Sequence, residues 1–389
     1  MTVTFTTDPL ASARELAPLV EAEADATEAA GTLSPAVVQA LAERGLFGLL
    51  LPSELGGMEA DAATTLAVYE ELCRADPSTG WSFLANTCTS GFAGAFCGDA
   101  AVAAMFPPGK VVSHAGMLGP RGSAVPEDGG YRVSGRFSFG SGSGHADWIG
   151  AGTVVAGPDG PLMGANGLPE LRVTFLPRHE VEFLGNWDVL GLQGTGSFDY
   201  EVKDRFVADD FTFSLMSPTV HRGGSVYRLG VLGLTSVGHC GFALGVAQRA
   251  LEEAARVAPS KVRMSSFTPV SDDRLFQYDF AHHEAAFRSV RAYSYELFEQ
   301  ADSIARTGAD PDAELQLRLR QVTTYATHVA ADVVRAAFGW LGTDGIRPTV
   351  IQRLLRDVQT AAQHIFVDSS TFCSATPALL ASYQKSAAR

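Results

Sequence analysis

Two segments of the chain hold residue types that can carry out chemistry. The first, residues 139–148 (FGSGSGHADW), follows a strand-like run, and its glycines would let the backbone come close to a ligand. The second holds Arg353, Asp357 and His364, which at 100° per residue share a stripe about 40° wide on a predicted helix. A histidine there could transfer a proton near its unperturbed pKa of about 6.5. The alternative is a core histidine bonded to a backbone carbonyl.

The spacing of apolar residues, which indicates the helices and strands that must position these residues, changes along the chain. Residues from about 10 to 96 show helical spacing, with Ser34-Pro35 as a start signal and Asp76-Pro77 as a break before a helix near Gly80. Between about 109 and 213 the apolar period is two, with a hairpin signal at 127–130 (EDGG). Four long helical segments follow, the last over 348–370. The sequence therefore predicts an α+β fold, with an N-terminal α-helical domain (1–108), a middle β-barrel or sandwich domain (109–213) and a C-terminal four-helix bundle (214–389).

Composition narrows the class of protein. Of the 389 residues, 46% are hydrophobic and 19% are charged, which is enough for a large core. The net charge of −14 argues against nucleic acid and against an anionic membrane surface as partners. The five cysteines include no Cys-x-x-Cys pair, which is typical of reduced thiols, and the N-terminus lacks a basic segment followed by an apolar one. We therefore expect a cytoplasmic protein, without a membrane segment, that acts on small molecules.

Several common motifs are absent from the sequence. It contains no phosphate-binding P-loop, no Gly-x-Gly-x-x-Gly after a strand and no Gly-x-Ser-x-Gly elbow. This disfavours a Rossmann nucleotide-binding domain and a serine hydrolase. The adjacent His282 and His283 would point about 100° apart on a helix, so we expect no metal site.

Four motifs, in order along nearly the whole chain, together resemble the acyl-CoA dehydrogenase superfamily. They are 51–57 (LPSELGG), 129–148 (GGYRVSGRFSFGSGSGHADW), 187–207 (WDVLGLQGTGSFDYEVKDRFV) and 348–366 (PTVIQRLLRDVQTAAQHIF). In one large branch of dehydrogenases a catalytic Glu follows an Arg-Asp pair, but His364 and Ile365 stand there in this chain.

A second branch of the superfamily is the better match. Trp187-Asp188, the loop 194–197 (GTGS) and Gln363-His364 resemble two-component flavin-dependent monooxygenases. Examples are dibenzothiophene monooxygenase, 4-hydroxyphenylacetate hydroxylase and the hydroxylases of aromatic polyketide pathways in secondary metabolism.

This resemblance implies a reduced-flavin-dependent monooxygenase that hydroxylates a small, aromatic or polycyclic metabolite. Such an enzyme takes reduced FAD or FMN from a separate NAD(P)H-dependent flavin reductase and reacts it with O2 to a C4a-hydroperoxyflavin. The resemblance also implies a homotetramer, because flavin sites in the family are completed by a neighbouring subunit. Two alternatives stay open: an FAD-dependent acyl-CoA dehydrogenase or desaturase, and a non-catalytic member that binds flavin or a partner.

The resemblance also assigns roles to single residues. His364 and Ser141 become catalytic, with Ser141 as the partner of flavin N5 unless it merely belongs to a turn. The implied flavin-binding residues are Phe139, Ser141, Trp187, Thr195 and Ser197 near the ring, and Arg263 and Gln277 at the nucleotide end. The implied substrate pocket is lined by Asn86, Thr89, Ser90 and His364.

Three of these assignments carry a further expectation. Some monooxygenases of this branch carry a histidine in the helix that follows the Gly-Trp pair, whereas this chain offers Asn86, Thr89 and Ser90 there. The site is therefore expected to hold a single histidine, and His145 is expected to be structural. Phe139 could equally belong to the core of the β domain. Arg263 could equally be a solvated loop arginine.

Overall fold

The computed structural model describes residues 8–164, 167–264 and 267–387. Its first third is helical, with short connections. The Ser34 side chain accepts from Val37 N–H, which confirms the predicted start at Ser34-Pro35. Asp76 caps the next long helix by accepting from Thr79 N–H, so this helix begins at Pro77, three residues before the predicted start. The helices are α1 (Pro9–Ala22), α2 (Ala24–Ala30), α3 (Pro35–Glu43), α4 (Ala62–Ala75), α5 (Pro77–Phe96) and α6 (Asp99–Met105).

The middle third forms one sheet, in the strand order β6-β7-β2-β1-β3-β5-β8, with β4 paired to β3. The predicted hairpin is confirmed: Glu127 pairs with Gly130, and Gly129 takes the positive φ of 76° that the turn requires. Only the pairing of β1 with β3 is parallel among the described strands. The strands are β1 (His114–Glu127), β2 (Gly130–Gly140), β3 (Trp148–Gly157), β4 (Gly160–Pro161), β5 (Leu171–Pro177), β6 (Glu182–Phe183), β7 (Phe198–Ala208) and β8 (Thr212–Ser214).

The last part of the chain is helical again, which confirms the predicted fold class. The fourth predicted segment is not one long helix, however. It forms α10, a 3-10 turn at Ile365–Val367 and a separate helix α11. The helices are α7 (Gly230–Val257), α8 (Arg274–Arg306), α9 (Ala313–Leu341), α10 (Val350–Ala361) and α11 (Ser370–Ala387).

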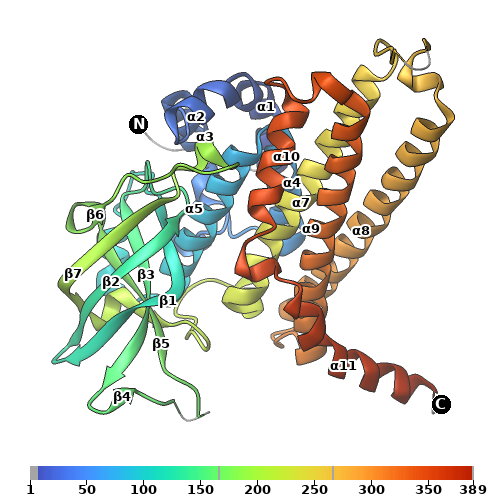
Figure 1. Ribbon diagram of the computed structural model, residues 1–389. Coiled ribbons are helices and arrows are strands. Elements are labelled where there is room, and N and C mark those ends of the chain that lie inside the picture. The colour runs from blue at the N-terminus through green and yellow to red at the C-terminus, as the bar shows by residue number, and fades with distance from the viewer. Residues whose placement is uncertain (1–7, 165–166, 265–266, 388–389) are drawn as a thin grey trace.

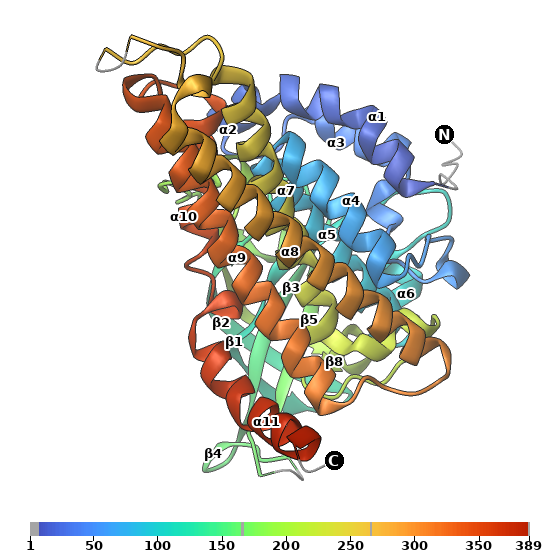
Figure 2. The same cartoon turned by 90° about the vertical axis from the view of Figure 1, so that its right-hand side faces the viewer.

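Helix α7 lies at the centre of the molecule. Figures 1 and 2 show the sheet on one side, then α5, α4 and α7, and α8 and α9 on the other side, while α11 extends away from the body. The stretch Ser225–Val257 is long and apolar enough to cross a membrane, but 83% of its most apolar window is buried inside the fold. Its small residues allow α4 to come close: a Cβ on Gly241 would stand 2.6 Å from Tyr69 Cβ.

Candidate active site

A chain of hydroxyl groups links the two glycine-rich loops to helix α5. Trp81 of α5 donates its indole N–H to Ser141 Oγ over 3.0 Å. Ser141 Oγ lies 2.8 Å from Ser197 Oγ, which lies 2.6 Å from Thr195 Oγ1. Thr195 Oγ1 donates in turn to the carbonyl of Leu192 over 2.8 Å. The structure thus brings together three of the residues that the sequence placed beside the flavin ring.

The direction of these bonds leaves one free position on Ser141. Because the Thr195 hydroxyl gives its hydrogen to a carbonyl, it accepts from Ser197, and Ser197 accepts from Ser141. Ser141 Oγ therefore uses its hydrogen on Ser197 and one lone pair on Trp81, and a second lone pair remains. In this arrangement Ser141 can accept a hydrogen bond from a ligand but has no hydrogen left to donate.

Two aromatic side chains near Ser141 form an exposed edge. Phe139 has a left-handed backbone with φ of 66°, which is uncommon for a bulky residue, and its side chain is 54% exposed. Trp187 packs edge-on against it, with ring centroids 6.2 Å apart, and donates its indole N–H to the Leu192 carbonyl over 3.0 Å. Phe139 therefore lies outside the core of the β domain. Strained backbone of this kind clusters at ligand-binding sites.

The loop of residues 191–197 is held against α10. Asp357 Oδ1 accepts from Leu192 N–H at 2.5 Å. A Cβ on Gly191 would stand 2.1 Å from the carbonyl oxygen of Arg356, so no larger residue fits there. Asp357 is buried, which raises the pKa of its carboxyl group to about 7, and its Oδ2 has no partner among the described residues.

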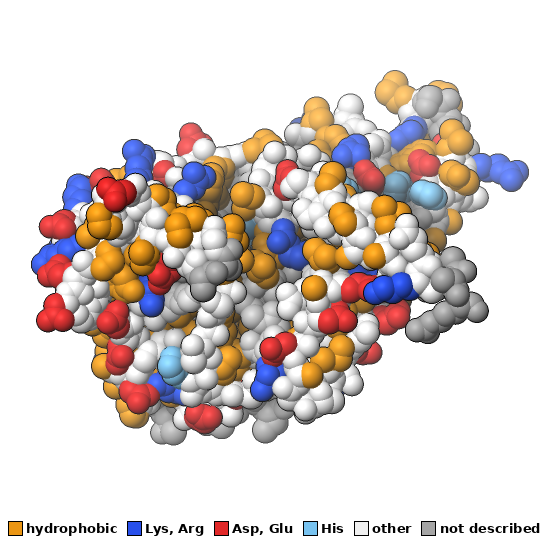
Figure 3. Space-filling view, turned by 90° about the horizontal axis from the view of Figure 1, so that it is seen from below, with side chains coloured by type: hydrophobic (Ala, Val, Ile, Leu, Met, Phe, Trp, Pro, Cys, Tyr) orange, Lys and Arg blue, Asp and Glu red, His pale blue; other side chains and the backbone are white. Residues whose placement is uncertain are grey.

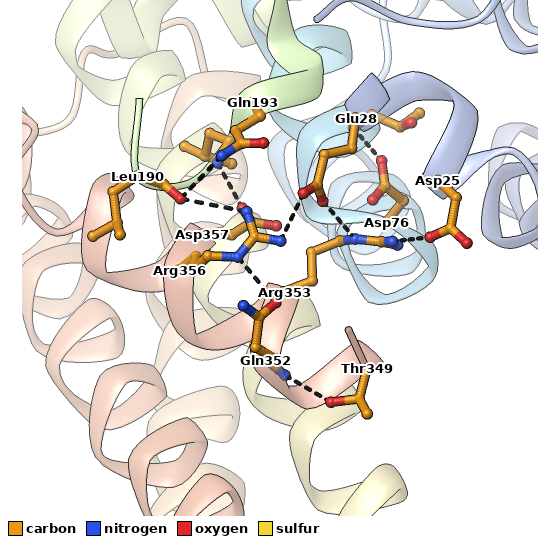
Figure 4. A network of polar contacts seen from close by, with 12 residues as sticks. Asp25, Glu28, Asp76, Leu190, Gln193, Thr349, Gln352, Arg353, Arg356 and Asp357 are labelled. Carbon is orange, nitrogen blue, oxygen red and sulfur yellow. Dashed lines mark hydrogen bonds and ion pairs between the residues drawn. The ribbon is translucent and has the colours of Figure 1, made fainter. Parts of the chain in front are cut away.

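Two arginines of α10 tie helix α2 to the same loop (Figure 4). Arg353 pairs with Asp25 and, over 2.9 Å, with Glu28. Arg356 pairs with Glu28 over 2.7 Å and donates to the carbonyl of Leu190 over 3.3 Å. This network positions α10 and, through it, the loop that carries the hydroxyl chain.

A pair of histidines lies beside Trp81. The ring centroids of His239 on α7 and of His364 are 4.4 Å apart, and the Trp81 ring lies edge-on to them at 5.0 and 5.8 Å. Phe366 stacks on His239 at 5.2 Å. The expectation of a single histidine was therefore wrong. His239 was missed because it stands among small apolar residues of a core helix, where its only signal is a titratable side chain in an apolar stretch.

His364 does not lie on helix α10. The helix ends at Ala361, and His364 begins the next turn, where its Nδ1 accepts from Phe366 N–H over 3.2 Å. This local bond takes the place of a helical one. The predicted stripe shared with Arg353 and Asp357 is therefore wrong.

Burial determines the protonation state of the His239 and His364 rings. It lowers the pKa of His239 well below its ordinary value and that of His364 to about 4, so both are neutral at pH 7. The unperturbed value near 6.5 does not apply to His364. Because its Nδ1 accepts a hydrogen bond, the neutral ring carries its hydrogen on Nε2 and offers an N–H donor.

The polar residues of α5 point into the protein. Asn86 is fully buried, donates from Nδ2 to the carbonyl of His114 over 2.8 Å, and has its Oδ1 2.9 Å from His145 Nε2. Ser90 Oγ lies 3.0 Å from His114 Nδ1, and Thr89 is buried as well. Asn86 and Ser90 thus fasten β1 and the loop 139–148 to α5, and His145 takes part in the same attachment. Ser90 also borders a pocket of about 270 Å³.

The glycines of the loop 139–148 serve its packing. A Cβ on Gly142, where φ is 75°, would stand 2.5 Å from Asn86 Nδ2, and one on Gly144 would stand 2.1 Å from Thr32 Oγ1. Protein atoms fill the space beside both glycines. The expectation that these two positions let a ligand approach the backbone was therefore wrong.

Arg263 and Gln277 lie far from Ser141 in the same chain. Both belong to the connection from α7 to α8 and the start of α8, at the end of the helices away from the sheet (Figure 1). The Arg263 guanidinium lies 4.2 Å over the Trp340 ring and donates to the Gly339 carbonyl over 3.0 Å. Gln277 is exposed, and its Nε2 donates to the Ser271 carbonyl over 3.0 Å. Among the described residues, no group of three or more His, Cys, Asp and Glu is arranged to hold a metal ion.

Comparison with known proteins assigns this arrangement to a family. Residues 11–108 match the model of the acyl-CoA dehydrogenase N-terminal domain, and residues 237–369 match that of the acyl-CoA dehydrogenase C-terminal domain. The chain is 31% identical to an indole-3-acetate monooxygenase from Pseudomonas putida over 350 residues, which cover 88% of this chain and 86% of the relative. It is 27% identical to the flavin-dependent monooxygenase, oxygenase subunit HsaA, from Rhodococcus jostii (strain RHA1), and the match covers 90% of this chain and 92% of the relative.

A solved structure agrees with these matches. XiaF from Streptomyces sp., in complex with FADH2 and glycerol, superposes with a TM-score of 0.82 at 21% identity, over 94% of each chain. At this identity the superposition shows the fold. The sequence matches go further: this chain belongs to the acyl-CoA dehydrogenase superfamily, in its branch of flavin-dependent monooxygenases.

Proposed function

We propose that this chain is the oxygenase component of a two-component monooxygenase, which uses reduced flavin and O2 to hydroxylate a small aromatic compound. The observation that carries the proposal is the free lone pair of Ser141 beside the exposed edge of Phe139 and Trp187. Reduced flavin has a hydrogen on N5, whereas oxidised flavin has a lone pair there. A hydroxyl group that can only accept therefore favours the reduced form.

The residues around Ser141 suit a flavin ring in shape and polarity. Phe139 and Trp187 would hold the flat ring, and Ser141 would accept from its N5–H. Leu190, which is 64% exposed, adds apolar surface to the same loop. The hydroxyls of Thr195 and Ser197 fix the orientation of Ser141, so its acceptor position is set before the ligand arrives.

His364 would hold an oxygen atom at the site by a hydrogen bond. Bound reduced flavin supplies the two electrons that let one atom of O2 enter the product while the other leaves as water. The neutral His364 ring would donate its Nε2–H to an oxygen atom of O2 or of the substrate and so fix the position of that atom. Trp81 and His239 pack against this ring, and Phe366 stacks on His239, so the ring is partly shielded from water, which strengthens that bond.

An acyl-CoA dehydrogenase is the weaker candidate. Its chemistry needs a carboxylate to remove the substrate α-proton, and the position after the Arg-Asp pair holds His364 and the exposed Ile365. Asp357 is buried and already holds the 191–197 loop through Leu192. The indole-3-acetate monooxygenase of Pseudomonas putida favours an aromatic substrate here as well.

The remaining proposals concern the assembly and its surroundings. We infer a homotetramer in which Arg263 and Gln277 reach the phosphate end of the flavin of a neighbouring subunit. Support comes from their end of the helices, where large apolar side chains are exposed, among them Met264, Phe267, Leu275 and Tyr278. A separate reductase would supply the flavin, as the oxygenase-subunit relative suggests. A cytoplasmic location and the domain limits 1–108, 109–213 and 214–389 belong to the same proposal.

Oxygen labelling tests the proposed reaction. The purified chain is mixed with a flavin reductase, NADH, FMN or FAD, isotopically labelled O2 and a panel of aromatic compounds that includes indole-3-acetate and indole. We expect a hydroxylated product that carries one labelled oxygen atom and that needs both the chain and the reductase. If no labelled product forms, and acyl-CoA instead reduces a dye acceptor without O2, the chain is a dehydrogenase.

A further inference from the structure

Arg320 on α9 is a partly buried cation without an acidic partner. Its Nε is buried and has no hydrogen-bond partner among the described residues, and it forms no ion pair with them. Burial lowers the pKa of its guanidinium group. Arg249 on α7 is the contrast, because it pairs with Glu21 and, over 3.0 Å, with Glu253, and the bond from Glu21 raises its pKa. A buried charge that lacks a counter-charge is costly, so proteins rarely keep one without a use.

Arg320 lies next to the histidine pair. Its guanidinium is 4.2 Å over the Phe366 ring, and its Nη2 donates to the Phe366 carbonyl over 3.2 Å. The Phe366 ring also stacks on the His239 ring, with the two centroids 5.2 Å apart. The pKa of His239 is lowered first by burial, then by the neighbouring His364 and then by the positive charge of Arg320. The charge of Arg320 therefore acts on the His239 ring.

An open pocket of about 800 Å³ lies at the beginning of the two helices that carry these residues. Leu232 lines it at the start of α7, and Gln316 lines it on α9. His239 lies two turns beyond Leu232 on the same face of α7, and Arg320 lies one turn beyond Gln316 on the same face of α9. The two helices lie side by side (Figures 1 and 2). A small molecule that enters there would meet Arg320 before it reaches the histidines.

The surface supports such an entrance. Figure 3 views the molecule from below and shows a hollow between the sheet and the C-terminal helices, with hydrophobic and basic side chains at its edge. Two residues of the 800 Å³ pocket, Met216 and Leu232, are large apolar side chains that are 55% and 42% exposed. Arg228 and Arg306 also line this pocket, but each has an acidic partner, Asp310 at 2.9 Å and Asp61 at 3.6 Å. A pocket with apolar side chains that leads to one basic group without such a partner is suited to a ligand that is mostly ring and carries a single negative charge.

We propose that Arg320 binds a carboxylate group of the substrate, and that the substrate is therefore an aromatic acid. This inference rests on the proposed function, because it takes His364 as the place where the ring is hydroxylated. A guanidinium group can hold a carboxylate by two parallel N–H bonds, and the free Nε–H would supply one of them. The acid would also provide the counter-charge that Arg320 lacks, whereas an uncharged amide of the same shape would not.

Binding of matched acids and amides tests the inference without any turnover. Indole-3-acetate and phenylacetate, and the amide of each, are titrated calorimetrically into the full-length protein without flavin. We expect at least one acid to bind about 10- to 100-fold more tightly than its amide, because a hydrogen bond to a charged group stabilises by about 1.5–3 kcal/mol. Equal affinity for acid and amide, or no binding by any of the four, would overturn the inference.

Two variants on α9 locate the effect. Arg320→Gln should reduce acid binding to the level of the amide, and Arg320→Lys should retain part of the preference because it keeps the charge. Arg335→Gln is the control, since Arg335 lies on the same helix, is exposed and pairs with Asp332. If Arg320→Gln keeps the preference, or instead weakens FMN binding and leaves acid binding unchanged, Arg320 does not hold the substrate carboxylate.

The labelling experiment keeps the two proposals separate. If Arg320→Gln loses the preference for the acid while the wild-type protein forms no labelled product, the anion site stands and the proposed reaction fails. If labelled product forms but acid and amide bind alike, the reaction stands and the anion site fails. Thermal unfolding of each variant checks that a loss of binding does not reflect a loss of the fold.

Discussion

Replacing Asp357 with Asn should make the protein more stable near neutral pH. The carboxyl group is buried and its pKa is raised from 3.8 to about 7, first by burial and also by the negative charges of Asp76 and Glu28, while Leu192 N–H and Arg356 lower it. Between pH 4 and 7 the unfolded chain has lost the proton that the folded chain keeps. The free energy of unfolding therefore falls as the pH rises through this window.

The size of the effect follows from these two pKa values. A shift from 3.8 to about 7 is close to three units, which corresponds to a loss of about 4 kcal/mol above pH 7. At pH 5 the loss is smaller, about 1.7 kcal/mol. Asn cannot ionise, so Asp357→Asn removes the pH-dependent loss in the free energy of unfolding. The Oδ1 of Asn can still accept from Leu192 N–H, so the loop of residues 191–197 stays attached to α10. Its stability relative to the wild type should therefore rise by about 2–3 kcal/mol from pH 5 to pH 8.

Denaturant unfolding of wild type and variant at pH 5, 6, 7 and 8 measures this difference. The midpoints should move apart as the pH rises, with the variant unfolding at the higher denaturant concentration. The exposed Asp332, replaced by Asn, is the control and should shift the midpoint by the same small amount at every pH. A difference between Asp357→Asn and wild type that stays constant from pH 5 to pH 8 would refute the raised pKa, and with it the burial argument.

Three other perturbations test the site. Ser141→Ala should leave the Trp81 indole N–H unpaired and remove the acceptor for N5–H, so that less reduced flavin binds under anaerobic titration and more NADH is consumed per product. His364→Ala should lower the rate of product formation about 10²- to 10⁴-fold, whereas His364→Gln, which keeps an N–H donor, should lose less; equal losses would contradict the donor role. Since the pKa of His364 is about 4, that residue should produce no change in rate between pH 6 and 8. Arg353→Gln removes the ion pair with Asp25 and one of the two ion pairs of α10 with Glu28, and it should lower the melting temperature by about 2–4 °C, with little change in substrate KM.

The sequence predicted those parts of the site that depend on local order. The strand before Ser141 and the loop that holds Thr195 and Ser197 both follow from short-range patterns, the period of two and the clustered glycines. Once the two loops were recognised as neighbours in a known family, Trp187 followed as well. The hydroxyl chain itself was not predicted, because its directions depend on the carbonyl of Leu192 and on an indole from another helix.

Long-range packing decided what the sequence could not show. The helical period around 353–364 continues past the point where α10 ends, since nothing in the spacing shows that the side chain of His364 will bond to a backbone N–H two residues later. His239 and Arg320 each look like ordinary helix residues in their own segments. Only the packing of α7 and α9 against the turn at Phe366 brings them together.

The position of His364 has a consequence for the order in which the site is assembled. Trp81, Ser141 and His239 all come before His364 in the sequence, so the turn at Ile365–Val367 joins the site after them during synthesis. Helices and the sheet can form as they emerge from the ribosome. A chain truncated before His364 would therefore contain every residue of the hydroxyl chain but would lack the N–H donor that this histidine offers.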